Sequence, residues 1–230
     1  MLSAIPVVAA DLGVEPVSIL LSPQQQTAAI KISNASDLPT TVQIQVVAWS
    51  QVDGKDVYTP TKELLAAPPI VTIAANGEQI IRTALRRRAD PASELSYRIF
   101  IQDLPAPPTP GFRGLQVALR IGLPVFVKPQ QGLAAPIMLW RVTRGPANSL
   151  ELNLKNHGNG HVQVSDFTVH LVGQDTPIAG DSGASYVLAG QSRTWILKTR
   201  STASTADGRL HLHAHTDAGE VDVELDADRP

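Results

Sequence analysis

The sequence of 230 residues contains no cysteine, which excludes a disulfide scaffold, a cysteine-ligated zinc site and catalysis by a thiol. Aromatic residues make up only 4% of the chain and charged residues 17%, with a formal net charge of −2. No basic stripe stands out, so we expect no nucleic-acid partner. No run of about 18 or more apolar residues occurs, so we expect no membrane span.

Turn-forming residues are plentiful, with 18 prolines and 16 glycines, and 43% of the residues are hydrophobic. This composition is typical of a globular fold with many turns. Segments rich in Val, Ile and Thr, each bounded by Pro, Gly, Asn or Asp, predict strands. They lie at 14–22, 27–36, 40–51, 68–73, 77–85, 96–104 and 115–127, and then at 137–142, 150–156, 161–172, 193–199, 210–216 and 220–225.

The strand pattern is interrupted once, by PQQGLAAP at 129–136, which we interpret as a linker. No long amphipathic helix is evident. About seven short strands in the first half are typical of a β-sandwich. The sequence therefore predicts an all-β protein of two tandem sandwiches, at 11–128 and 137–230.

The first ten residues, MLSAIPVVAA, resemble the end of a signal peptide, because a short apolar run ends in small residues before Asp11. From this run we expect export, with processing near Ala10. The positively charged opening of such a peptide is missing. A frayed N-terminal extension or an artefact of the gene start is the alternative.

Two patterns suggest enzyme chemistry at first sight. GDSG at 180–183 matches a serine-protease nucleophile loop, but it lies in a turn-like context without a recognisable triad, so Ser182 is better explained as a surface residue. His211, His213 and His215 alternate on one predicted strand and share a face that could hold a metal. We identify no further ligand at a suitable spacing.

A third pattern is a row of alternating carboxylates near the C-terminus, which we interpret as a solvated strand face rather than a glycosidase pair. Its members are Glu220, Asp222 and Glu224. We accordingly expect no catalytic residue, no metal and no cofactor.

The most unusual segment is GLQVALRIGLPVFVKP at 114–129. Leu115, Val117, Leu119 and Ile121 recur at every second position, which predicts a long strand that is apolar on one face. The segment follows a loop rich in proline and glycine. A long apolar strand at a sheet edge is normally an aggregation hazard, so a protein that retains one has a use for it.

Four blocks in order, at 32–49, 67–82, 94–108 and 115–129, resemble the PapD-like periplasmic pilus-assembly chaperones. The resemblance implies two immunoglobulin-like domains at an angle. It also implies that the last strand of the first domain lends apolar side chains to an incomplete pilin subunit, which is then delivered to an outer-membrane usher. Leu115, Val117 and Leu119 match the donor residues, with Ile121 as an extension.

The resemblance further implies a charged trio that links the two domains and fixes their angle. Arg82, Glu94 and Asp217 align with its members. A paired trio avoids a desolvated charge standing alone. The alternative is three unrelated surface charges.

The sequence departs from the family at the anchor for the client's C-terminal carboxylate. The family uses an Arg in the first strand and a Lys in the last, but Ser18 and Pro124 stand there. Arg98 is our best substitute, because it alternates with core-facing neighbours and because guanidinium binds carboxylates in a bidentate manner. Lys128 is second. We also expect Pro124 to interrupt strand pairing.

The leading hypothesis is a divergent periplasmic chaperone without enzymatic activity that binds pilus or fimbrial subunits. The departure leaves three explanations open: a different anchor, strand pairing alone, or another kind of client. The alternative function is a tandem immunoglobulin-like surface or structural protein that self-associates by its edge strands. A hydrolase is the third. The identity of the client and a self-capping dimer of the free protein stay open.

Overall fold

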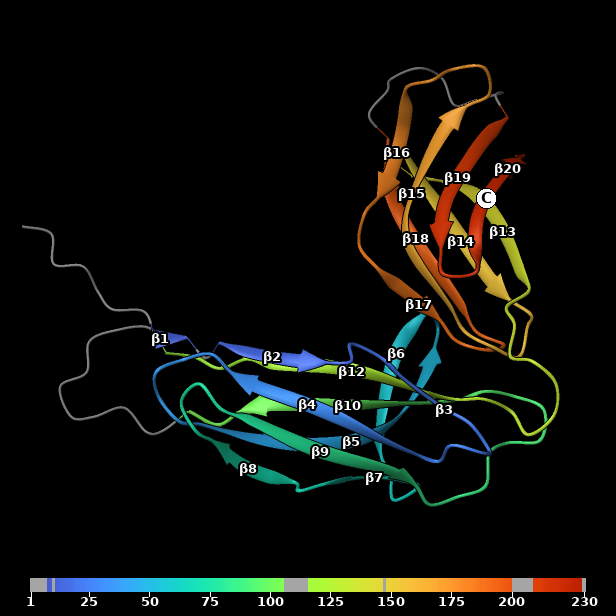
Figure 1. Cartoon of the computed structure of the whole chain (residues 1–230). Helices are drawn as coiled ribbons and strands as arrows, with labels where there is room; N and C mark the ends of the chain where they lie inside the picture. The colour runs from blue at the N-terminus through green and yellow to red at the C-terminus, as the bar shows by residue number, and fades with distance from the viewer. Residues whose placement is uncertain (1–7, 10, 106–115, 147, 200–208, 229–230) are drawn as a thin grey trace, which may run out of the picture. The chain divides into compact units, whose positions relative to one another are not determined.

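The computed structural model describes residues 8–9, 11–105, 116–146, 148–199 and 209–228. Every regular element in these residues is a β-strand, as Figure 1 shows, and the prediction of an all-β protein is confirmed. Within the same residues, no helix has the length and hydrophobicity needed to cross a membrane.

The chain divides into two compact units. The first contains residues 1–49, 58–90 and 95–130, and the second contains 50–57, 91–94 and 131–230. The sequence pattern predicts one division at 129–136, whereas two short segments of the first half also join the second unit.

Gln51 illustrates why the segment 50–57 belongs to the second unit. Its side-chain nitrogen donates a hydrogen bond of 2.9 Å to the backbone oxygen of Tyr186, and its Oε1 accepts one of 3.0 Å from the backbone N–H of Leu188. Its side chain is buried. Hydrogen bonds between such distant positions cannot be deduced from local sequence patterns.

The first unit is a sandwich of two sheets. One sheet has the order β2 (Leu12–Glu15), β4 (Thr27–Asn34), β9 (Glu78–Leu85), β7 (Leu64–Ala67). The other has the order β3 (Ile19–Leu21), β12 (Arg120–Val127), β10 (Leu95–Asp103), β5 (Thr40–Val52), β6 (Lys55–Pro60), with β8 (Ile70–Ile73) also on β5.

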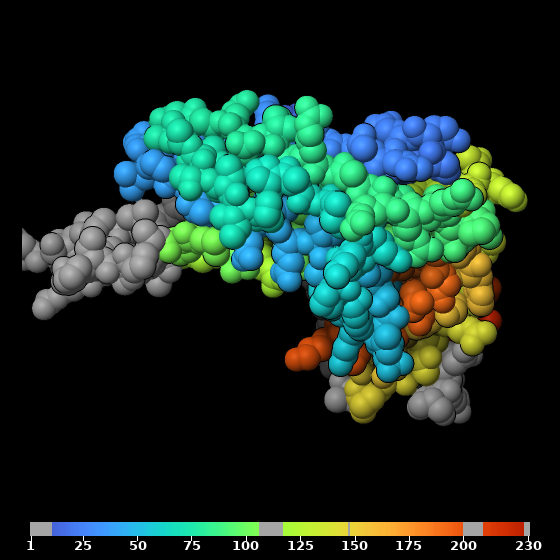
Figure 2. Space-filling view, turned by 90° about the horizontal axis from the view of Figure 1, so that it is seen from below, coloured from blue at the N-terminus to red at the C-terminus, as the bar shows by residue number. Residues whose placement is uncertain are grey.

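In β4, β9 and β10 of the first unit every second side chain is buried toward their C-terminal ends, as the period of a strand predicts, whereas β12 buries all five residues from Leu123 to Val127. Fully buried Ile30 and Ile81 come from the first sheet, and Ile99 and Leu123 come from the second. Figure 2 shows the face that carries β7 and β9 (teal to green) as a continuous surface of side chains.

The second unit is also a sandwich with its own core. One sheet has the order β18 (Ser192–Lys198), β14 (Ser149–Asn156), β13 (Met138–Gly145), β21 (Ala227–Asp228). The other has the order β16 (Pro177–Asp181), β15 (Val162–Leu171), β19 (Leu210–Thr216), β20 (Gly219–Leu225), with β17 (Ser185–Val187) also on β15. Leu152, Leu154, Val162 and Leu212 are fully buried between the sheets.

Candidate functional site

The strand β12 lies at the side of its sheet and has one edge that is only partly covered. It pairs with β10 along its whole length, from Arg120 to Val127. On the other side, β3 pairs only with the three residues Val125–Val127. Among the described residues, the stretch 120–124 therefore presents unpaired main-chain groups at this edge, where another strand could add.

The core-facing side chains of this strand become more exposed toward its N-terminal end. Val127 and Val125 are 0% exposed and Leu123 is 2% exposed. Ile121, two positions earlier, is only half-buried against the core. Val117 is 37% exposed. The apolar side chains at alternate positions are thus less covered by their own domain toward the start of the segment.

The predicted donor residues lie in different structural contexts. Leu115 lies outside the described residues. Val117 lies in β11 (Gln116–Val117), which pairs in parallel with β1 (Val8–Ala9). Leu119 is half-buried in a short break between β11 and β12, where its backbone oxygen accepts a hydrogen bond of 2.9 Å from Asp103. The prediction of one uninterrupted strand from 115 to 127 is wrong at Ala118–Leu119.

Pro124 does not interrupt pairing in the way the sequence predicted. The register between β10 and β12 runs without a shift through the pair Arg98↔Pro124. Pairing with β3, however, begins only at Val125. An edge strand tolerates proline because its free side has no ladder hydrogen bond to lose.

Arg98 lies on the face of β10 opposite to the buried Ile99. Its guanidinium carbon is 4.1 Å from the centroid of the Trp49 ring and 5.9 Å from that of Tyr58. A Cβ atom at Gly122, on the neighbouring strand, would come within 3.3 Å of Arg98 Nη1. The guanidinium thus packs on the Trp49 ring and beside the bare backbone of Gly122.

A second guanidinium, which sequence reasoning missed, lies on the same face. Arg120 is 3.9 Å from the centroid of the Phe100 ring, measured from its Cζ. It also donates a hydrogen bond of 3.4 Å to Gln45. The sequence feature that could have identified Arg120 is its even spacing from Gly122 and Pro124, which places the three residues on one face of the strand. Lys128, the other predicted anchor, is exposed just after β12, and its backbone N–H bonds to Leu21.

The predicted charged trio is corrected in one member. Glu94 is buried and its Oε1 is 2.7 Å from His161 Nδ1 and accepts a second hydrogen bond, of 3.1 Å, from the His161 backbone N–H. Asp217 Oδ2 lies 3.6 Å from His161 Nε2. Arg82 instead has an exposed side chain on β9, so the prediction that it is buried is wrong.

Glu94, His161 and Asp217 all belong to the second unit. The sequence pattern did not point to His161, because a lone histidine just before a strand gives no periodic signal of its own.

The Ser182 pattern lies in a turn. The residue is exposed between β16 and β17, and nearby Asp181 accepts a hydrogen bond of 3.4 Å from the Gly183 backbone N–H. Within the part of the chain that the structure describes, no histidine is hydrogen-bonded to Ser182.

The three histidines of β19 do share one face, but carboxylates join them from neighbouring strands. Asp222 Oδ1 is 2.5 Å from His211 Nε2, and Asp166 Oδ1 is 2.7 Å from His215 Nδ1. These hydrogen bonds lower the pKa of Asp222 and raise the pKa of His215. Among the described residues, no group of three such side chains has a geometry that could hold a metal.

Residues 11–132 match the family described as pili and flagellar-assembly chaperone, PapD N-terminal domain. The chain belongs to this family. Its members are chaperones rather than enzymes, and the resemblance drawn from the four sequence blocks is confirmed. No curated protein matches the chain.

Several solved structures of pilus chaperones share the fold across nearly the whole chain. A chain in the CsuC–CsuE chaperone–tip adhesion subunit pre-assembly complex of Acinetobacter baumannii is 20% identical, with a TM-score of 0.68 and coverage of 94% of this chain and 98% of that one. The complex of the SafA pilin with the SafB chaperone from Salmonella enterica gives 17% identity, a TM-score of 0.64 and coverage of 96% and 97%.

The E. coli chaperone DraB gives 16% identity, a TM-score of 0.62 and coverage of 97% of this chain and 100% of that one. The predicted fold of two immunoglobulin-like sandwich domains is thereby confirmed.

Proposed function

We propose that this pilus-assembly chaperone acts in the periplasm, where it binds pilus or fimbrial subunits by lending them its strand at 115–121 and delivers them to an outer-membrane usher. The observation that carries the proposal is the decline of burial along β12 and β11. The apolar alternation of the sequence continues past the break at Ala118–Leu119, into a region that the domain itself covers less. A client that lacks a strand would supply the missing cover.

The free edge and the side chains have separate roles in this proposal. Main-chain groups at 120–124 would pair with a client strand and supply affinity. Val117 and Leu119 would fill client pockets, with Ile121 at the boundary between the client and the chaperone's own core. The sequence-matched Leu115 completes the donor set.

Arg98 is the proposed anchor for the client's C-terminal carboxylate. The contact with Trp49 and the approach to Gly122 favour this role, because they restrict the position of a planar guanidinium, the group that binds carboxylates in a bidentate manner. Arg120 lies on the same face and would add a second positive charge. Lys128 is the alternative cation, although its side chain is more exposed and its position is therefore less restrained by neighbours.

The class of client follows from the family and from what its solved members contain. The titles of two matched structures name a chaperone together with a tip adhesion subunit and with a pilin. The first also names chaperone–usher pili, which supports an usher as the receiving partner. The family match favours this function over a self-associating surface protein.

The decisive experiment is periplasmic co-expression with candidate pilin subunits, followed by affinity purification of this chain. We expect a soluble one-to-one complex, and we expect Leu119→Glu to lose it, because a carboxylate cannot enter an apolar client groove. Ile80→Glu is the matched control, since Ile80 is an exposed apolar residue on β9, in the other sheet.

The possible outcomes are distinguishable once both variants are shown to be folded. Capture that survives Leu119→Glu would exclude strand donation at this position. Loss of capture with both variants would indicate a general defect and not a donor strand.

A further inference from the structure

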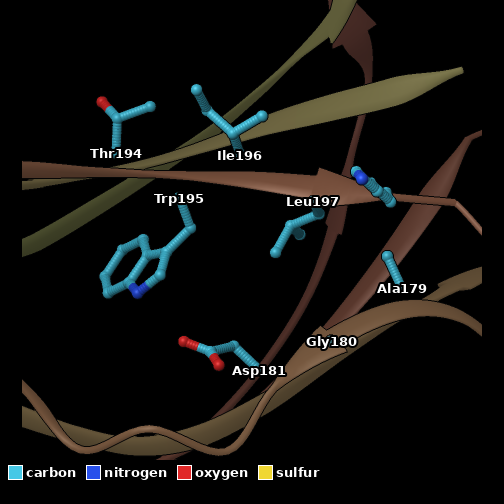
Figure 3. A pocket seen from close by; sticks show the side chains of 8 residues that line it. Ala179, Gly180, Asp181, Thr194, Trp195, Ile196 and Leu197 are labelled. Atoms are coloured by element: carbon cyan, nitrogen blue, oxygen red, sulfur yellow. The ribbon is translucent and has the colours of Figure 1, made fainter. Parts of the chain in front are cut away.

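The second unit has a cleft that the proposed function does not use. The cleft has a volume of about 620 Å³ and lies between β16 and β18, which are the outermost strands of the two sheets. Figure 3 shows it with Trp195 and Leu197 pointing inward from β18. The volume falls within the range of about 300–1,000 Å³ that is usual for ligand sites.

The turn at Gly54, in the same unit, limits what the cleft can receive. A Cβ atom at Gly54 would lie 3.5 Å from the backbone oxygen of Ser192 and 3.6 Å from the backbone nitrogen of Thr194. The turn therefore lies against the start of β18 and leaves at most the residues from Trp195 to Lys198 for an added strand. So short an edge favours a compact ligand over a further strand.

Trp195 lines the cleft with an indole N–H that has no acceptor. The residue is 7% exposed, and its Nε1 is buried without a hydrogen-bond partner among the described residues. The ring is held in place by Trp140, whose centroid is 6.0 Å away, and by Phe167 at 5.4 Å. A buried donor without an acceptor is destabilising, so a ligand that accepts from it gains affinity.

Asp181 lines the same cleft from β16 with a carboxylate. Figure 3 shows this carboxylate on the side of the Trp195 ring that carries the nitrogen. Its Oδ1 accepts a hydrogen bond of 3.4 Å from the Gly183 backbone N–H, and its Oδ2 accepts none from the described residues. A donor and an acceptor thus face one space.

The chemistry of the ligand follows from these two groups. A hydroxyl can accept from the indole N–H and donate to the carboxylate through one atom, whereas an ammonium cannot accept and a carboxylate cannot donate. Asp181 and Lys198 are the one acid and the one base among the lining residues, so their formal charges cancel. Leu197 and Ala179 add apolar surface. The combination fits a neutral ligand with several hydroxyls and a C–H face, which describes a saccharide.

A second hollow extends the site beyond one sugar ring. It has a volume of about 460 Å³, shares Ala179–Asp181 with the first and continues onto Phe167 and Thr168 of β15. Asp181 therefore lies where the two hollows meet. Each is far larger than the roughly 30 Å³ that one water molecule occupies in the liquid.

We propose that the cleft between β16 and β18 binds a neutral oligosaccharide. One hydroxyl would bridge Trp195 Nε1 and Asp181 Oδ2, and the ammonium of Lys198 would donate to a neighbouring hydroxyl. The C–H face of the ring would lie against Leu197. This chaperone would thereby contact a glycan through its second unit, independently of the donor strand in the first.

The test is two-dimensional ¹H–¹⁵N NMR of the full chain, titrated with maltotriose and with the trimer of N-acetylglucosamine. The chain has three tryptophans, so it gives three indole N–H signals. We expect the signal that disappears in Trp195→Phe to shift most on titration with at least one of the two sugars. Asp181→Ala should weaken the affinity for that sugar by about fivefold or more, because the hydroxyl loses its acceptor.

Two matched controls locate the site and define its chemistry. Trp140 also has a buried indole nitrogen without an acceptor among the described residues, but it does not line the cleft, so Trp140→Phe should leave the affinity within about twofold. A trimer of galacturonate, which is anionic, and a trimer of glucosamine, which is cationic, should each bind at least about threefold more weakly than the neutral sugar.

Three results would overturn the proposal. They are the absence of a shift with both neutral sugars, an equal loss of affinity in Trp140→Phe and Asp181→Ala, and equally tight binding of the charged trimers. Capture of pilus subunits by Trp195→Phe should equal that of the unmodified chain, and its loss would assign the cleft to the client instead. Subunit capture rests on the first unit, so the absence of sugar binding leaves the proposed function intact.

Discussion

The smallest feature beside the proposed anchor is the absence of a side chain at Gly122. Its backbone is not in the left-handed region, so the glycine is not required by conformation. A Cβ atom there would lie 3.3 Å from Arg98 Nη1 and 3.2 Å from Phe100 Cε1, so these side chains would have to shift by a few tenths of an ångström. The orientation of the proposed anchor thus depends on a neighbouring strand.

Gly122→Ala tests this dependence. The added methyl group must displace Arg98 or Phe100, so we expect subunit affinity to fall by roughly three- to tenfold, which corresponds to about 0.7–1.4 kcal/mol. The unfolding free energy should change less. Isothermal titration with a purified subunit measures the first and urea unfolding the second. Gly183→Ala is the control, because its Cβ would meet no atom closer than 3.6 Å; equal effects of both substitutions would refute the packing argument.

Glu94 and Arg82 provide a second comparison at the scale of single residues. Glu94→Ala leaves the partly buried backbone N–H of His161 without its acceptor, so we expect a loss of about 1–3 kcal/mol in unfolding free energy. Glu94→Gln retains an acceptor oxygen and should lose less. Arg82→Ala should stay within about 0.5 kcal/mol, because the side chain is exposed. Denaturant unfolding measures these losses. An arginine-centred network would instead require Arg82→Ala to lose more unfolding free energy than Glu94→Ala.

At the scale of elements, β12 shows how pairing changes the meaning of a sequence pattern. Its alternation of apolar residues is the same at Ile121 as at Val125. The two residues differ because β3 covers only the final three residues of the strand. The local pattern therefore indicates a strand, whereas its use as a core or an edge depends on the strand beside it.

The sheet of β15, β19 and β20 places a pH-dependent contact across its strands. His215 on β19 faces Asp166 on β15 and Glu220 on β20, and the hydrogen bond to Asp166 raises the pKa of His215. A raised pKa means that the contribution of this contact is complete below the unfolded value of about 6.5. It is lost as the pH rises through the folded value.

Asp166→Asn should therefore destabilise the protein more at about pH 5.5 than at about pH 8.5. The effect should be small, because the groups are exposed and screened by solvent. Urea unfolding at the two pH values measures the difference, and Asp175→Asn, in an exposed loop, is the control. A larger destabilisation at the higher pH would contradict the assigned sign.

At the scale of the whole molecule, each unit has its own core. The first unit carries the proposed donor strand and Arg98, and the second carries the Glu94–His161–Asp217 network. A chaperone must keep a client-binding edge available without aggregating, and the edge proposed for this role is short because β3 pairs with Val125–Val127.

The sequence by itself determined the fold class, the positions of most strands and the family, because strand period and turn residues are local properties. It also placed Arg98 correctly on the face opposite to Ile99. It did not reveal His161 as the partner of Glu94, the carboxylates beside the β19 histidines or Gln51 in the second unit. Only the tertiary structure decided these, because strand neighbours distant in sequence bring the groups together and leave no periodic signal.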